Sequence, residues 1–208
     1  MRRINKGKPF QDFENFKREK CPNSWDDFES EPEIRSNTRK YILENEQQLL
    51  CGYTELPITF EPTSSHIDHF RRKSAEFFPE LTFEWNNLIV SCCSDDFGGR
   101  YKDLTYLKGK SKKAYNNILN PVIENPHDYF EYTEWGQIIP KSGLNTAMIL
   151  KATETIEAFK LTHESLRTRR YAMIEKTKAY KSDFSLNEIK EYLKEDGFIS
   201  VIEQFGNN

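Results

Sequence analysis

The segment between Cys51 and Lys102 most constrains the fold of this chain, because its amino-acid composition and hydrophobic pattern differ from those of the segments on both sides. It carries glycine, proline, serine, aromatic residues and paired acids in short stretches, whereas residues 34–50 and most of the chain after residue 143 have helical spacing. Short mixed stretches favour brief strands and turns over long helices. We therefore predict an α+β fold, in which a small loop-rich module lies between an N-terminal helical segment and a C-terminal helical bundle.

The basic arm of residues 1–20 carries three phenylalanines spaced three apart, Phe10, Phe13 and Phe16. This spacing predicts a short amphipathic helix, and we expect its aromatic face to dock on a partner. Glycine and proline return between residues 120 and 143, which predicts a hairpin through Tyr129–Tyr132 and Gln137–Ile139.

The C-terminal third has clear helix signals. Four apolar residues recur at helical spacing and are expected to face the core. Residues 185–188 match a capping box, in which Ser185 and Glu188 satisfy free N–H groups at a helix start, and Gly197 is placed to end that helix. The four apolar residues are Ile149, Ala152, Ile156 and Phe159.

Length and charge limit the classes of function. A chain of 208 residues fits one compact domain, or a catalytic module framed by helical extensions. No stretch approaches the roughly 20 apolar residues of a membrane span, and no hydrophobic run follows the basic N-terminus, so we expect a cytoplasmic protein without a membrane partner. The net charge of −3 argues against a basic nucleic-acid coat protein, but not against an enzyme whose groove alone is positive.

The chemistry-bearing residues begin at the motif His66-Ile-Asp68-His69-Phe70. A histidine suits a general base at neutral pH, since its ordinary pKa is about 6.5, and an adjacent carboxylate offers the hard oxygen that Mg²⁺ prefers. Hydrolysis of a phosphodiester needs both a base and a cation. The pair alone is weak evidence, because a surface loop with two histidines would look the same.

Three further motifs in the same order strengthen the interpretation. They are Cys51-Gly-Tyr-Thr-Glu55 before the histidines, and Phe78–Leu88 and Ser91–Lys102 after them. With these motifs the stretch 51–103 resembles an HNH endonuclease, and specifically the PtuB family of HNH proteins that are encoded with retrons and Septu anti-phage systems. The likeness extends to the segments around 120–130 and 136–140 and to the helical tail, and so covers most of the chain.

The resemblance implies a role for each matching residue. His69 would be the general base and Asp68 the first metal ligand. Asn87 would be the middle Asn of the motif, whose side chain pins the loop that holds the base. Four basic residues would contact nucleic-acid phosphates: Arg71, Arg72, Lys73 and Lys102. The alternative is that these charges only form a solvated surface, as charge runs often do.

Two features depart from the family pattern. Many relatives bind a structural zinc through two cysteine pairs, but here the second position of the first pair is Thr54 and that of the later pair is Gly98 or a neighbour. Two or three cysteines are too few for such a site, so we predict that structural Zn²⁺ is absent and that the remaining cysteines, Cys51 and Cys92 or Cys93, are small buried residues.

The second departure concerns the third letter of the HNH motif, which falls on Gly99, a residue without a ligand atom. Several alternatives stay open. Asp103 lies one helical turn later, His66 precedes Asp68, and Asp95 and Asp96 lie nearby. Two protein ligands with waters would also suffice for Mg²⁺, or the site is inactive.

The resemblance implies a nuclease effector of anti-phage defence that cleaves nucleic acid with one divalent ion, Mg²⁺ or Mn²⁺. It also implies control by an ABC/SMC-like ATPase of the PtuA type, in some systems joined by a retron reverse transcriptase with its RNA–DNA product. We expect three regions: a docking arm and helix (1–48), the HNH ββα-metal module (49–110) and a mainly helical region (111–208). The alternative function is an inactive adaptor of the same fold that binds the ATPase or nucleic acid. DNA and RNA such as tRNA both stay open as substrates.

Overall fold

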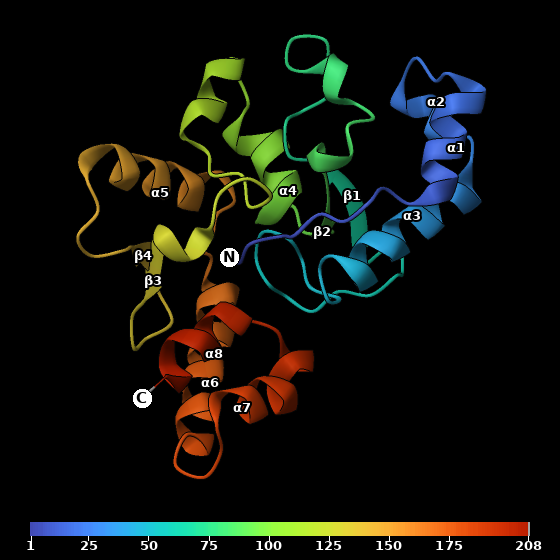
Figure 1. The fold of residues 1–208 in the computed structure, drawn as a ribbon. Coiled ribbons are helices and arrows are strands. Elements are labelled where there is room, and N and C mark those ends of the chain that lie inside the picture. Colours follow the sequence, from blue (N-terminus) through green and yellow to red (C-terminus); the bar gives the residue numbers. More distant parts are fainter. Residues whose placement is uncertain (208) are drawn as a thin grey trace.

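Helices make up most of the regular secondary structure in this computed structural model, which describes residues 1–207, and two small two-stranded sheets make up the remainder of it. The predicted α+β class is confirmed. Figure 1 shows the order of the elements along the chain. The helices are α1 (Gln11–Lys20), α2 (Trp25–Glu29), α3 (Pro32–Asn45), α4 (Gly98–Tyr101), α5 (Thr146–Ala158), α6 (Glu164–Tyr180), α7 (Leu186–Leu193) and α8 (Ile199–Gly206), and the strands are β1 (Ser65–His69), β2 (Leu88–Cys92), β3 (Phe130–Tyr132) and β4 (Ile138–Pro140).

The N-terminal arm forms the expected amphipathic helix, α1, but its aromatic face is turned inward. Phe13 and Phe16 are 0% and 3% exposed and contact Phe28 of α2 at ring distances of 5.4 and 5.1 Å. Phe10 is half-buried and stacks on Tyr41 of α3. The rings of Phe13 and Phe16 therefore pack within the chain itself, where their large apolar area is already buried, and docking of the arm on a partner stays a prediction.

The helix predicted over residues 34–50 is shorter than expected. α3 ends at Asn45, and the backbone of Gln48 and Leu49 then takes the left-handed conformation, with φ of 54° and 59°. This conformation cannot continue a right-handed helix, so the chain turns away from α3 toward the segment that begins at Cys51. Leu49 is 43% exposed as a result.

Strands β1 and β2 form an antiparallel hairpin at the centre of the fold. Ser65 pairs with Cys92 at one end and His69 with Leu88 at the other. Strand β2 is buried along its whole length, because β1, α3 and α4 all pack against it. In Figure 1 the hairpin lies between α1–α3 on one side and α4 on the other. The order strand, strand, helix thus occurs within residues 65–101.

The C-terminal region follows the sequence signals closely. The predicted hairpin is confirmed as β3 and β4, and the capping box is confirmed at the start of α7, where Ser185 and Glu188 bond each other's backbone N–H. Gly197 has φ of 81° just before α8. Ile149 was expected in the core but is 44% exposed, because the buried face of α5 begins only at Ala152.

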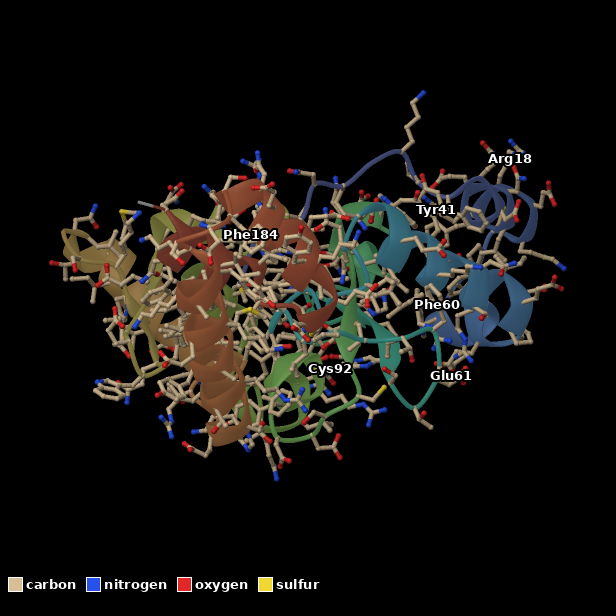
Figure 2. All side chains as sticks on the ribbon, turned by 90° about the horizontal axis from the view of Figure 1, so that it is seen from below. Arg18, Tyr41, Phe60, Glu61, Cys92 and Phe184 are labelled. Carbon is tan, nitrogen blue, oxygen red and sulfur yellow. The ribbon has the colours of Figure 1, made fainter. Side chains whose placement is uncertain are left out.

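One hydrophobic core includes residues from all three predicted regions, and the region boundaries stay a prediction. Figure 2 shows Cys92 in the middle of the molecule, with Tyr41 on the N-terminal helices to one side and Phe184 on the C-terminal helices to the other. Across residues 1–207, no helix combines the length and apolar character needed to span a bilayer. The central hairpin and α4 are therefore supported from both ends of the chain.

Candidate active site

His69 is the last residue of β1, and its imidazole is held by a backbone carbonyl. Its Nε2 lies 2.9 Å from the carbonyl oxygen of Thr82, and the residue is 6% exposed. A carbonyl only accepts hydrogen bonds, so Nε2 carries the proton and Nδ1 is left as an acceptor. Burial lowers the pKa of His69 to about 4. The ring is therefore neutral at pH 7, the protonation state that a general base requires.

Asp68 precedes His69 on β1, and its carboxylate points toward a different neighbour, since successive strand residues face opposite sides. Its Oδ2 accepts a hydrogen bond of 2.5 Å from the Tyr53 hydroxyl and lies 3.1 Å from the ammonium of Lys102. A Cβ added to Gly99 would lie 2.7 Å from the carboxylate carbon of Asp68. Glycine at this position therefore lets α4 approach the carboxylate closely, although it supplies no ligand atom.

Lys102 is a fully buried cation between two carboxylates. Its Nζ lies 3.1 Å from both Asp68 Oδ2 and Asp103 Oδ1, and it donates to the carbonyl oxygens of His69 and Phe70 at 2.7 and 3.0 Å. Burial alone would lower the pKa of Lys102, but Asp68 and Asp103 outweigh it, and the pKa is raised.

This placement does not agree with the role expected for Lys102. With 0% exposure and four oxygen neighbours, the ammonium does not face the open cleft, where a phosphate would be. The sequence motif gives the position of this lysine along the chain, but its side chain is turned inward to neutralise the carboxylates.

Asp103 follows Lys102 in a π-helical turn, where Leu107 N–H bonds the Lys102 carbonyl at 2.9 Å. Burial and the nearby Asp68 raise the pKa of Asp103 to about 6, against the opposing effect of Lys102. Its Oδ1 is buried and makes no hydrogen bond of good geometry, even though the Lys102 ammonium lies near. The hydrogen-bonding capacity of Asp103 Oδ1 is therefore only partly satisfied.

The three candidate metal ligands line one cleft of about 870 Å³. His66 Nε2 is 4.0 Å from Asp68 Oδ1, while its Nδ1 is 3.6 Å from Cys93 Sγ, and burial lowers the pKa of this histidine. Within residues 1–207 no group of three or more His, Cys, Asp or Glu side chains is close enough to hold a metal. The donor set of Asp68, Asp103 and His66 does not form a ready-made cage. It fits a hard cation held by few protein atoms and completed by water and phosphate, as Mg²⁺ is often bound.

Asn87 precedes β2 and is 4% exposed. Its Oδ1 accepts from Arg71 N at 2.7 Å, and its Nδ2 donates to the carbonyl oxygens of Arg71 and Leu81 at 2.9 and 3.1 Å. These bonds tie the loop after His69 to the segment that carries Thr82. Such contacts are those expected of the supporting Asn, although its part in catalysis stays a prediction.

The basic residues fall into two groups. Arg72 and Lys73 line the cleft, as does Arg100, which sequence reasoning did not single out. Arg71 instead lies exposed over the ring of Phe78, at 5.0 Å, and is not among the residues that line the cleft. A second hollow of about 540 Å³ adjoins the cleft and brings in two more arginines of α3, Arg35 and Arg39.

Two other residues of the site lie outside the predicted set. Tyr53 belongs to the opening motif, so its place in that motif was a usable signal for its bond to Asp68. Trp25 packs against His69 with a ring distance of 4.4 Å, but it comes from α2, and nothing in the sequence connects it with the histidine.

The buried cysteines lie behind the site rather than in it. Cys51 and Cys92 are 1% and 6% exposed, as expected, and their sulfur atoms are 3.7 Å apart, whereas Cys93 is only half-buried. Thr54, in place of a third cysteine, is also buried near them. The absence of structural zinc stays a prediction.

Comparison with known proteins gives one informative match. No family model matches the chain. A curated Escherichia coli protein named "Retron Ec83 putative HNH endonuclease" is 27% identical to it, and the alignment covers 80% of this chain and 73% of that protein. The chain is thus a distant homologue of the retron Ec83 protein over most of its length.

Proposed function

We propose that this chain is an HNH nuclease that hydrolyses a phosphodiester bond of nucleic acid in the cleft between β1, α2 and α4. One observation carries the proposal: Nε2 of His69 lies 2.9 Å from the Thr82 carbonyl oxygen, and His69 and Asp68 line the same cleft. A base with one free nitrogen next to a carboxylate is what attack by water on phosphorus requires.

In this mechanism Nδ1 of His69 accepts a proton from a water molecule as the water oxygen attacks phosphorus. The bond from phosphorus to the leaving oxygen breaks, and solvent protonates that oxygen. Arg72, Lys73 and Arg100 line the cleft and would neutralise the phosphate charge. Mg²⁺ or Mn²⁺, when bound, supplies positive charge to the phosphate and leaving oxygen, and Asp68 would hold it with Asp103 or His66.

The distant homologue is named for a retron, and this supports a role together with retron components. We propose that the chain is an anti-phage effector, that an ABC/SMC-like ATPase of the PtuA type controls it, and that a retron reverse transcriptase with its RNA–DNA product joins the assembly in the cytoplasm. We take DNA as the substrate, and RNA is the second arm of the test.

The test uses the purified chain, alone and with the ATPase and retron components. Labelled DNA and tRNA are incubated with Mg²⁺, with Mn²⁺ or with a chelator. We expect metal-dependent cleavage that His69→Ala reduces by roughly 10²–10⁴-fold. His127→Ala is the control, because that histidine pairs with Glu203 and neither residue lines the cleft. Cleavage that is equal in the His69 variant would contradict the proposal.

A second candidate function is a non-catalytic adaptor, and Lys102 favours it. Its ammonium already neutralises Asp68, and Gly99 adds no ligand, so the site has less need of a cation than an ordinary HNH centre. If no assembly cleaves DNA or RNA and His69→Ala protects cells from phage as well as the unchanged protein does, the adaptor function is the correct one.

A further inference from the structure

The indole of Trp25 is the second contact that holds the His69 ring. The two rings meet edge to face, with a centroid distance of 4.4 Å and an interplanar angle of 81°. Both residues are buried, at 7% and 6% exposure. Trp25 is the first residue of α2, so the contact joins α2 to the end of β1.

The hydrogen bond to Thr82 does not by itself fix the plane of the imidazole. The second side-chain torsion of histidine is broad, and a single bond at Nε2 leaves the ring free to rock about it. Edge-to-face packing against a large ring limits that rotation. The carbonyl of Thr82 is itself fixed, since the Thr82 hydroxyl donates to the Pro79 carbonyl at 2.6 Å.

Trp25 is also held firmly, as a positioning residue must be. The side chain of Asp27 accepts backbone hydrogen bonds from Asn23 and Ser24 at 2.7 and 2.9 Å, and this fixes the first turn of α2. The indole packs against the rings of Phe28 and Phe83, with centroid distances of 4.9 and 5.8 Å. The helix start and this aromatic cluster together set the orientation of the indole.

The indole also lies where the site opens. Trp25, His69 and Lys73 line both the main cleft and the adjoining hollow, and the Lys73 ammonium is 6.0 Å from the indole ring. A displacement of Trp25 would therefore disturb the His69 ring and the part of the cleft wall next to the Lys73 ammonium.

We infer that Trp25 is a positioning residue, which holds the plane of the His69 imidazole so that Nδ1 stays directed at the cleft. The importance of Trp25 for catalysis rests on the proposed nuclease function. The orientation of the ring, however, is a property of the folded chain and is measurable without any reaction.

The experiment compares Trp25→Leu and Trp25→Phe with Phe16→Leu in the full chain. Phe16 belongs to the same aromatic cluster and contacts Phe28 and Phe83, so its variant is a matched control for loosening of that cluster. The first readout is the nitrogen spectrum of labelled histidine at pH 7. We expect one sharp Nε2–H tautomer for His69 in the unchanged protein and in Phe16→Leu, averaged signals in Trp25→Leu, and partial recovery in Trp25→Phe.

The second readout is cleavage by the assembled complex. We expect Trp25→Leu to lower kcat roughly 10–100-fold with little change in KM, because a base displaced by about 1 Å loses much of its effect. A His69 spectrum and a kcat in Trp25→Leu that match those of the unchanged protein would overturn the inference, as would equal changes in Phe16→Leu. If the unchanged protein cleaves nothing, the proposed function fails, and the spectrum still decides whether Trp25 fixes the ring.

Discussion

Replacing Lys102 with methionine tests the most unusual feature of the site, a buried ammonium shared by two carboxylates. The side chain is 0% exposed, and its removal takes away the ammonium that lies 3.1 Å from both Asp68 Oδ2 and Asp103 Oδ1. Asp68 Oδ2 then keeps the Tyr53 hydroxyl as a neutral partner. Removal of one partner from a buried ion pair costs about 3–5 kcal/mol, because an uncompensated charge stays behind.

For a chain of this size, 1 kcal/mol shifts Tm by about 2–4 °C, so Lys102→Met is expected to lower Tm by about 6–20 °C. Urea unfolding followed by tryptophan fluorescence gives the free energy of unfolding, and thermal denaturation gives Tm. Lys108→Met is the matched control, since Lys108 is an exposed lysine close in sequence, and its effect is expected within about 0.5 kcal/mol.

A double variant separates the ion pair from packing. Adding Asp103→Asn to Lys102→Met removes one of the two unpaired carboxylates, so the double variant is expected to be less stable than the unchanged protein by less than the sum of the single effects. A loss below about 1 kcal/mol in Lys102→Met would refute the reasoning, because the free energy of unfolding would then not depend on the buried ammonium.

Three further predictions follow from the same geometry. Gly99→Ala is expected to cost about 1–3 kcal/mol in urea unfolding, because the new Cβ would meet the Asp68 carboxylate at 2.7 Å, and an unchanged midpoint would contradict that contact. The pKa of His69 is about 4 in the folded state against 6.5 ordinarily, so the unfolded state binds the proton first as pH falls. Stability is then lost between those values, by up to about 3 kcal/mol from His69. The total change between pH 7 and pH 4 should differ by that amount in His69→Gln, because the other groups with shifted pKa values, among them His66 and Asp103, titrate in both proteins. Phe13→Ala is expected to cost about 3–5 kcal/mol in the isolated chain, and a neutral effect would contradict its burial within the chain.

Several elements of the fold can be predicted from short sequence signals, because turn residues and capping residues each favour a particular local structure. The turn residues before residue 143 indicated the β3–β4 hairpin, and the Ser185–Glu188 pair indicated the start of α7. These features depend on residues a few positions apart, so no knowledge of the rest of the chain is needed. The burial of one face of α1 within the chain was harder to predict. The spacing shows that Phe13 and Phe16 share a face, but not which residues cover that face.

The candidate site likewise contains some residues that the sequence places together and others that only the fold brings together. Asp68 and His69 are adjacent in the sequence, and both line one cleft, as the motif indicated. Trp25 and Tyr53 reach the same two side chains from other segments, 44 and 15 positions away from their partners. Pairs of this kind need the closed tertiary structure, because their sequence separation carries no distance information.

The sequence by itself indicated a mixed module between helical segments, the adjacency of His69 and Asp68, and the position of Asn87 directly before Leu88, since each depends on neighbours along the chain. Only the tertiary structure decided that Lys102 pairs with Asp68 inside the protein, that Gly99 makes room for that carboxylate, and that Trp25 packs on His69. The physical reason is burial. Whether a lysine faces a phosphate or a carboxylate depends on which side chains exclude water around it, and that is settled when distant segments pack together.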